Sequence, residues 1–385
     1  MYSHLFCSKP FNFIDIKRNK AGVCCWVKLP IWQGESADFS IDSAWNSDNA
    51  QKIRKSILDG SFSYCSKDCP FLHGAAAPPA VQEKQDSVIH GFLSAISNPV
   101  QGRDQLKDTG MLQIIRDNLC IMPDLPAFVE CGFDNSCNLS CPSCRNERQV
   151  ETEHQENILV MQNKVEQQLF PGLKSLYITG SGDPFGSPYF NRWLRKMSVS
   201  HFSDDAFIHL HTNAQLWDEA MWNKLPESVR ERCKTCEISI DGTSAATYEL
   251  NRRGGDFNRL LNNLEFIAGL KRERKLLYLK IHMVVQENNY HEMPDFVALG
   301  RRLSADEVYF SYLSDWGTFS VTELEMRQVH LPTHARYHSF LKVLKHPYLR
   351  EPCVNLGNLN DIDCAQYQKT HHPLIRLREL VATGS

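Results

Sequence analysis

The feature that most constrains the fold is a regular alternation of short apolar segments with amphipathic ones from about residue 126 onward. The segments that we interpret as strands are 126–133, 175–179, 206–211, 237–241, 277–285 and 307–312. Helical periodicity lies between them, near 152–169, 189–198, 216–231, 256–272 and 291–303. Strands that alternate with helices of this length predict βα units and a parallel sheet. Six such units are two short of a closed eight-fold barrel, so we predict an α/β fold built on an open, partial (βα)6 barrel.

Directly after the first predicted strand, one short loop carries three cysteines, in the run Cys-Asn-Leu-Ser-Cys-Pro-Ser-Cys. They are Cys137, Cys141 and Cys144. Barrel folds gather catalytic groups at the C-terminal ends of their strands, which is where this loop falls. Thiolates are soft ligands that select iron–sulfur clusters or zinc, and three of them leave a fourth metal position open. The alternative interpretations are a zinc knuckle or three unrelated core cysteines.

The C-x3-C-x2-C spacing of this loop resembles the signature of the radical S-adenosylmethionine (SAM) enzymes. The resemblance implies that Cys137, Cys141 and Cys144 hold a [4Fe-4S] cluster whose open iron chelates SAM. In that family an electron from the cluster cleaves SAM to a 5′-deoxyadenosyl radical, which abstracts hydrogen from the substrate. It further implies an oxygen-sensitive enzyme and an electron donor such as flavodoxin or ferredoxin.

Segments at the ends of other strands match positions that bind SAM in this family. The run Thr-Gly-Ser-Gly-Asp-Pro after the second strand resembles the family's Gly-Gly-Glu segment, with Asp in place of Glu. Its small residues allow the backbone to approach a ligand closely, although a plain strand-to-helix turn is the alternative. Polar residues at the end of the fourth strand and a following Arg-Arg pair complete the match. The residues predicted to bind SAM are Gly180, Gly182, Asp183, Pro184, Ser239, Asp241 and Arg253.

Structural roles are the alternative for several of these polar residues. Asp241 can act as the N-cap of a helix that begins near Ser244. Either Arg252 or Arg253 can clamp a carboxylate with two hydrogen bonds, or can lie on the surface. Polar residues also end the third and fifth strands and are expected to face the cavity, namely His211, Asn213, Gln286 and Asn288.

The first 75 residues contain a second concentration of cysteines. The segment resembles the SPASM/Twitch auxiliary-cluster domain, in which four cysteines bind an additional [4Fe-4S] cluster, although that domain usually follows the barrel. The resemblance implies Cys7, Cys65, Cys69 and one of Cys24 and Cys25 as ligands, and we favour Cys24. A zinc ribbon with four thiolates is the alternative, because spacing alone does not distinguish zinc from iron.

The remaining cysteines give weaker signals. Cys233 and Cys236 precede the fourth predicted strand and, like Cys120 and Cys131, are interpreted as small buried hydrophobic residues. A free thiol in the C-terminal tail could donate a hydrogen atom to a substrate radical, and Cys353 and Cys364 are the candidates.

The predicted organisation has four parts. They are a SPASM/Twitch-like domain at 1–75, a linker and packing segment at 76–125, a radical SAM barrel at 126–320 and a C-terminal extension at 321–385. The net charge of −3 gives no sign of a nucleic-acid partner. No segment has the length of a membrane span or the pattern of a secretory leader, so we expect a cytoplasmic protein with no membrane partner.

The substrate is the least constrained part of the prediction. The SPASM/Twitch resemblance favours modification of a peptide or protein. A dehydrogenase or epimerase that acts on a sugar or alcohol by the same radical chemistry is the alternative within the enzyme class. A non-catalytic protein that binds zinc through both cysteine groups is the alternative from another class.

Overall fold

The computed structural model describes residues 2–67, 69–72, 99–360 and 362. The predicted linker at 76–125 is therefore described only from residue 99, and Cys364 lies outside the described residues. The strands are β1 (Leu5–Cys7), β2 (Phe13–Lys17), β3 (Lys20–Gly22), β4 (Trp32–Gln33), β5 (Val100–Gly102), β6 (Phe128–Gly132), β7 (Ser175–Ile178), β8 (Phe207–Thr212), β9 (Cys233–Ser239), β10 (Tyr278–Val285), β11 (Glu307–Tyr312) and β12 (Val354–Asn355).

Helices follow most of the central strands. They are α1 (Lys9–Asn12), α2 (Ile41–Trp45), α3 (Asp48–Leu58), α5 (Thr109–Asp117), α6 (Gln155–Gln168), α7 (Pro188–Lys196), α8 (Glu219–Asn223), α9 (Glu227–Arg232), α10 (Ala245–Asn251), α11 (Phe257–Arg272), α12 (Met293–Arg302), α13 (Val321–Arg327) and α14 (Tyr337–Leu344). Within the described ranges, no helix combines the length and the apolar character that crossing a membrane requires.

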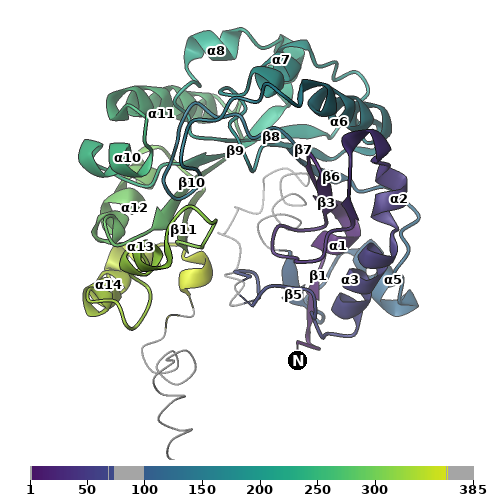
Figure 1. The fold of residues 1–385 in the computed structure, drawn as a ribbon, viewed down its shortest axis with the longest axis horizontal. Helices are drawn as coiled ribbons and strands as arrows, with labels where there is room; N and C mark the ends of the chain where they lie inside the picture. Colours follow the sequence, from purple (N-terminus) through teal and green to yellow (C-terminus); the bar gives the residue numbers. More distant parts are fainter. Residues whose placement is uncertain (1, 68, 73–98, 361, 363–385) are drawn as a thin grey trace, which may run out of the picture.

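The six strands from β6 to β11 form a continuous parallel arc in chain order. Figure 1 shows the arc with its helices on the outer side. This arrangement confirms the predicted α/β partial barrel. It follows from the sequence because each strand–helix–strand connection crosses over one face of the sheet and returns the next strand in parallel.

The sheet extends beyond the predicted barrel at both ends. β2 pairs in parallel with β6, and β3 and β4 continue the sheet in antiparallel order. At the other end β12 pairs in parallel with β11. Residues from the predicted N-terminal and C-terminal parts thus share one sheet with the barrel, while the boundaries between the four parts stay a prediction.

The apolar core lies between the sheet and the outer helices. Alternate strand residues point outward into it, such as Val129 of β6, Leu176 of β7 and Ile281 of β10, each at most 1% exposed. The intervening residues of the same strands point to the concave side, because side chains alternate between the two faces of a strand. The concave side is described with the site below.

Three predicted elements differ in detail from the structure. β9 begins at Cys233 rather than Glu237, so the Cys-x2-Cys pair lies within the strand. The predicted helix 216–231 is two helices, α8 and α9, because Pro226 stands between them and lacks the N–H that a continuous helix needs. In the N-terminal segment, for which no helix is predicted above, α3 is an 11-residue amphipathic helix.

Candidate active site

The cysteine loop leaves the end of β6 and is tied back onto itself and onto the neighbouring turn. The Asp134 carboxylate accepts hydrogen bonds from the Ser136 backbone N–H at 2.9 Å and from its hydroxyl at 2.7 Å. It also accepts one from the hydroxyl of Ser187, the N-cap of α7. The backbone N–H of Cys137 donates to Gln149 O at 2.9 Å, which closes the loop. The cysteines are therefore held by a fixed backbone.

Each of the three thiols of this loop receives a side-chain N–H. Cys137 and Cys141 are each 7% exposed, whereas Cys144 is exposed. The donors are Asn213 Nδ2 to Cys137 at 3.6 Å, Arg252 Nη1 to Cys141 at 3.8 Å and Arg145 Nη2 to Cys144 at 3.4 Å. The loop thus presents three thiol groups within a ring of polar donors.

Burial keeps the two inner thiols protonated in the metal-free chain. Burial, with the Asp183 carboxylate as the second cause, raises the pKa of Cys137 to about 12. Burial also raises the pKa of Cys141, while Arg252 acts in the opposite direction. A metal binds the thiolate, so its uptake here must release protons.

The donor set of the loop fits an iron–sulfur cluster. Three thiolates from one loop are the ligand type that such clusters use. Among the described residues, no three His, Cys, Asp or Glu side chains converge on the position of a single metal ion. A tetrahedral zinc ion needs its sulfurs roughly 3.8 Å apart, given Zn–S bonds of about 2.3 Å. Cys137, Cys141 and Cys144 would hold an iron–sulfur cluster through their thiolates.

The glycine-rich run after β7 packs directly against the cysteine loop. A Cβ atom on Gly182 would lie 2.5 Å from Ser136 O and 2.7 Å from Asp134 O. One on Gly180 would lie 2.0 Å from a carboxylate oxygen of Glu130. Gly182 therefore requires glycine for the close approach of two backbone segments, whereas at Gly180 the Glu130 side chain could move aside. This packing is one sufficient reason for Gly182, and a ligand role for both glycines stays a prediction.

Asp183 joins three parts of the site through its carboxylate. Its Oδ1 accepts hydrogen bonds from the backbone N–H groups of Phe185 and Gly186, at 3.0 and 2.8 Å. Its Oδ2 accepts from Thr212 Oγ1 at 2.7 Å and from the Asn213 N–H at 2.9 Å. The residue is 1% exposed and its neighbour Pro184 is also buried. The Asp183 carboxylate is thus fully occupied by protein donors.

The two polar residues at the end of β9, Ser239 and Asp241, contact different groups. Ser239 is 8% exposed, and its hydroxyl lies 3.0 Å from His211 Nε2. Asp241 has a left-handed backbone (φ +65°), accepts a hydrogen bond from the Val284 N–H at 2.7 Å and pairs with Arg252 at 2.8 Å. Ser244, not Asp241, is the N-cap of α10. The N-cap alternative for Asp241 is therefore wrong.

The two adjacent arginines both contact the cysteine loop but at different groups. Arg253 is exposed and donates hydrogen bonds to Ser140 Oγ at 3.1 Å and to the carbonyl of Asn146. Arg252 is directed to Cys141 and Asp241 instead. A role for Arg253 in binding SAM stays a prediction.

Of the remaining strand-end residues, His211 and Asn213 lie at the site described above. Gln286 is 2% exposed, and its backbone N–H donates to Asn289 Oδ1 at 2.6 Å. Asn288 Nδ2 donates to Asn251 Oδ1 at 2.8 Å. Asn288 therefore connects the end of β10 to α10, whereas the side chain of Gln286 accepts a hydrogen bond from Arg327 Nη1 at 3.4 Å.

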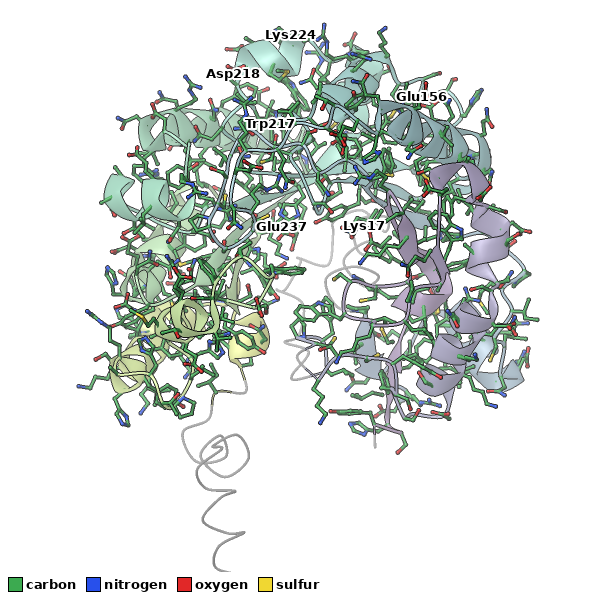
Figure 2. All side chains as sticks on the ribbon, in the orientation of Figure 1. Lys17, Glu156, Trp217, Asp218, Lys224 and Glu237 are labelled. Atoms are coloured by element: carbon green, nitrogen blue, oxygen red, sulfur yellow. The ribbon has the colours of Figure 1, made fainter. Side chains whose placement is uncertain are left out.

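The concave face of the sheet carries polar and charged side chains from seven neighbouring strands. Register places Asp15 of β2 beside Glu130 of β6, and Glu130 beside Tyr177 of β7. On the other side of the arc, Glu237 of β9 lies beside Lys280 of β10. Figure 2 shows Lys17 and Glu237 on the inner side of the arc, and Glu156 on its outer side. Residues on this face include Asp15, Lys17, Glu130, Tyr177, His209, His211, Glu237, Ser239, Lys280, His282, Tyr309 and Ser311.

Glu237 and Glu130 have opposite electrostatic surroundings. Burial acts to raise the pKa of Glu237, but Lys280 at 3.2 Å and the neighbouring histidines outweigh it and hold that pKa well below its usual range. Burial and then Asp15 raise the pKa of Glu130 to about 7. Lys17 opposes this rise, but it lies 4.0 Å from Glu130 and is closer to Asp15, at 3.2 Å. Glu130 can therefore exchange a proton near neutral pH.

The structure brings three of the N-terminal cysteines together. Burial and mutual repulsion raise the pKa values of Cys7, Cys65 and Cys69, each to about 12. The segment with Cys24 and Cys25 reaches this group through backbone bonds of residues 26–28 to residues 64–66. Their assignment as metal ligands, and the choice between Cys24 and Cys25, stay predictions.

The other cysteines have the surroundings of packing residues. Cys131, Cys233 and Cys236 are fully buried, which agrees with their interpretation as small hydrophobic residues. Cys120 is only partly buried and packs at the edge of the core. Cys353 is also partly buried, beside β12.

Sequence reasoning missed Arg145 and the charged residues of the concave face. Arg145 directly follows Cys144, but only the folded loop shows that its guanidinium turns back to Asn135 O and Ser181 O, both at 2.6 Å. A signal for the concave face was present, because Glu130, Glu237 and Lys280 occupy alternate positions within otherwise apolar strands. Charged residues at such positions indicate that one face of the sheet is not packed against an apolar layer.

The chain has low similarity to several solved structures. In comparison with solved structures, the chain is similar to SuiB from Streptococcus suis bound to S-adenosylmethionine, with 15% identity over 60% of this chain and 51% of SuiB and a TM-score of 0.38. TYW1 with a lysine-pyruvate adduct bound is 18% identical, over 55% of this chain and 68% of TYW1, with a TM-score of 0.33. Native anSMEcpe with bound AdoMet and a peptide is 19% identical, over 54% of this chain and 59% of anSMEcpe, with a TM-score of 0.35.

The alignment to SuiB spans about half of that protein, at 51% of its length. The comparison with curated proteins gives no match. Residues 133–300 match the family model of the Radical SAM superfamily, and this range contains the cysteine loop, the glycine-rich run and the strands from β7 to β10. Over this range, the chain is similar to the Radical SAM superfamily.

Proposed function

We propose that this protein is a radical SAM enzyme in which Cys137, Cys141 and Cys144 hold a [4Fe-4S] cluster. The single observation that carries the proposal is the loop itself, which follows the first barrel strand and holds three neighbouring thiols within the matched range. When bound, the cluster supplies the electron that cleaves SAM to a 5′-deoxyadenosyl radical. A donor such as flavodoxin or ferredoxin would provide that electron in a cytoplasmic setting.

The chain's own residues would bind SAM and exclude water around it. Backbone groups of the run from Gly180 to Pro184, with Ser239 and Arg253, form the proposed SAM site beside the loop. Asp183 and Asp241 would support this site indirectly. The Asp183 carboxylate holds the glycine-rich run against the end of β8, and the Asp241 carboxylate holds Arg252 in place.

We place the substrate on the concave face, where Glu130 and Glu237 stand on opposite parts of the arc. Our first candidate is a peptide or protein, because the SPASM/Twitch resemblance of residues 1–75 favours it. The polar concave face favours a second candidate, a small sugar or alcohol, since hydroxyl groups find many hydrogen-bonding partners there. In both cases Glu130 is suited to exchange a proton with the substrate.

We propose an auxiliary [4Fe-4S] cluster bound by Cys7, Cys65, Cys69 and Cys24. Its support is the resemblance of residues 1–75 to the auxiliary-cluster domain, together with the electrostatic interactions of Cys7 with Cys65, Cys65 with Cys69 and Cys69 with Cys7. The ammonium group of Lys9 interacts with Cys7, Cys24 and Cys25, so a cation is available to offset the charge of a metal–thiolate centre. Such a centre would act as an electron relay or acceptor.

The test begins with metal and sulfide analysis of the protein purified without oxygen. We expect iron and sulfide near eight each per chain, since two cubane clusters contain about four irons each. We also expect reductive cleavage of SAM to 5′-deoxyadenosine. Zinc in place of iron, with no SAM cleavage, would support the non-catalytic zinc protein instead.

Two variants separate the two cysteine groups. Replacement of Cys137, Cys141 and Cys144 by Ala should remove about four irons and abolish SAM cleavage. Replacement of Cys65 and Cys69 by Ala should also remove about four irons but leave the loop cluster detectable by electron paramagnetic resonance (EPR). Full iron content in the second variant would show that the N-terminal cysteines do not bind a cluster.

A further inference from the structure

Each thiol of the cysteine loop has its own side-chain N–H donor, and the three donors come from different parts of the fold. Asn213 at the end of β8 faces Cys137, Arg252 at the end of α10 faces Cys141, and Arg145 in the loop faces Cys144. Two of the three donors are cations. The loop is therefore surrounded by groups that favour negative charge on its sulfur atoms.

Arg252 is directed to Cys141 by an ion pair that is almost completely buried. Its Nη2 lies 2.8 Å from Asp241 Oδ2, with 13% of the Arg252 side chain and 1% of the Asp241 side chain exposed. Asp241 is itself fixed, because its Oδ1 accepts from the Val284 N–H and its carbonyl accepts from Asn251 and Asn289. The guanidinium consequently has one orientation, with Nη1 toward the sulfur.

Arg252 also has a donor that the described protein does not use. Its Nε is buried and has no hydrogen-bond partner among the described residues. Burial of an arginine with an unmet donor is costly unless an anionic group stands nearby. Asp241 supplies an anionic group at 2.8 Å, and Nη1 of the same guanidinium faces Cys141 Sγ at 3.8 Å.

Arg145 is fixed in a similar way by backbone carbonyls. Its Nη1 donates to Asn135 O and its Nη2 to Ser181 O, both at 2.6 Å, and the residue is 8% exposed. Neither carbonyl carries a charge, so the positive charge of Arg145 is not cancelled by a carboxylate partner within the described structure. It acts on the thiols of the loop.

We propose that Arg252 and Arg145 are positioning residues that set the reduction potential of the cluster bound by the loop. The inference rests on the proposed function, because it requires an iron–sulfur cluster at Cys137, Cys141 and Cys144. Reduction adds one electron and therefore one negative charge, with no bond made or broken in the protein. Nearby cations and N–H groups stabilise that added charge, so they raise the potential.

This arrangement has a functional consequence for the donor of the electron. A higher potential allows a weaker one-electron donor to reduce the cluster before SAM is cleaved. Asp241 limits the effect of Arg252, because its carboxylate cancels part of the positive charge near Cys141. Arg145 has no such limit and should contribute at least as much.

The experiment is an EPR-monitored redox titration of the full chain with its clusters, without SAM. The signal of the loop cluster is identified as the one absent from the Cys137→Ala variant. We expect Arg252→Gln and Arg145→Gln each to make one-electron reduction about tenfold less favourable, which is a fall of about 59 mV in midpoint potential. Arg252→Lys keeps the charge and should recover part of the loss.

Arg148→Gln is the matched control, because Arg148 is an exposed residue of the same loop without a hydrogen bond to a thiol in the described structure. Its midpoint potential should equal that of the unaltered protein. Iron present at the loop with an unchanged potential in both arginine variants would overturn this inference. Absence of iron from the unaltered loop would instead overturn the proposed function, so the two failures are distinguishable.

If Arg252→Gln does not fold or load iron, Arg145→Gln and Arg252→Lys decide the question. A fall in potential for Arg145→Gln supports the inference. An unchanged potential for Arg145→Gln, or equal shifts in Arg145→Gln and Arg148→Gln, contradicts it.

Discussion

Asp183 Oδ2 accepts a hydrogen bond from Thr212 Oγ1 at 2.7 Å and so connects the glycine-rich run after β7 to the end of β8. The same oxygen accepts from the N–H of Asn213, the residue whose amide faces Cys137. The position predicted to bind SAM is thus also the residue that holds two strand ends together. The structure assigns this carboxylate a structural role, and its role in binding SAM stays a prediction.

We expect Asp183→Asn to lower the free energy of unfolding by about 2–4 kcal/mol. An amide offers one oxygen where the carboxylate offers two, so two buried donors lose their acceptor. Urea unfolding of the metal-free chain measures the change. Asp205→Asn is the control, since Asp205 is exposed, and it should leave the stability unchanged. Equal stability of the two variants would contradict the role of Asp183.

We expect Gly182→Ala to displace the cysteine loop. Its Cβ would lie 2.5 Å from the Ser136 carbonyl, and backbone atoms give way only at a cost of about 1–3 kcal/mol. The variant should unfold at lower urea concentration and take up less iron. At Gly172 an added Cβ meets no atom within 4 Å, so Gly172→Ala is the control. Matching iron content in both variants would refute the prediction.

Glu130 should make folding stability depend on pH. Burial, and then repulsion by Asp15, place its pKa near 7, above the ordinary value of 4.5, while Lys17 and Lys9 oppose the shift and Glu237 adds to it. The folded chain therefore holds a proton between about pH 4.5 and 7 that the unfolded chain has lost. Stability from this group is complete below pH 4.5 and is lost as the pH rises through 7.

Glu130→Gln should accordingly be more stable than the unaltered protein at pH 8, on the order of 1–3 kcal/mol, with a smaller difference at pH 5. Unfolding by urea at the two pH values measures it. Glu156→Gln is the control, because Glu156 is exposed on α6 on the outer side of the arc (Figure 2). A difference that does not grow with pH would argue against the raised pKa.

Glu237 should contribute stability of the opposite pH dependence. Despite burial, Lys280 and the neighbouring histidines hold its pKa well below the ordinary value. Its contribution is therefore present above about pH 4.5 and is lost as the pH falls below that range. Glu237→Gln leaves the Lys280 ammonium buried without its partner at 3.2 Å, which costs about 3–5 kcal/mol.

The double variant Glu237→Gln with Lys280→Met provides the check on this explanation. It removes both charges, so it should recover much of the stability that the single variant loses. Thermal unfolding at pH 7 compares the three proteins. A double variant as unstable as Glu237→Gln would show that the loss does not come from the unpaired ammonium.

The sequence by itself determined the order of the barrel strands and the location of the cysteine loop. Periodicity of two in the strands and of 3.6 in the helices depends on local burial, so it is visible without the fold. The thiol spacing is equally local, because all three cysteines belong to one loop. These features also carried the family resemblance, which the match across residues 133–300 confirms.

Only the tertiary structure decided which distant groups meet at that loop. Arg252 lies 111 positions from Cys141, and Lys17 lies 164 from Ser181, so their contacts depend on how the whole sheet curves. The addition of β2 beside β6 likewise required the folded chain, because its partner is more than a hundred residues away. The local sequence pattern determines the helices, the strands and the cysteines of one loop. Which charged residues pair across the barrel depends on how the whole chain packs.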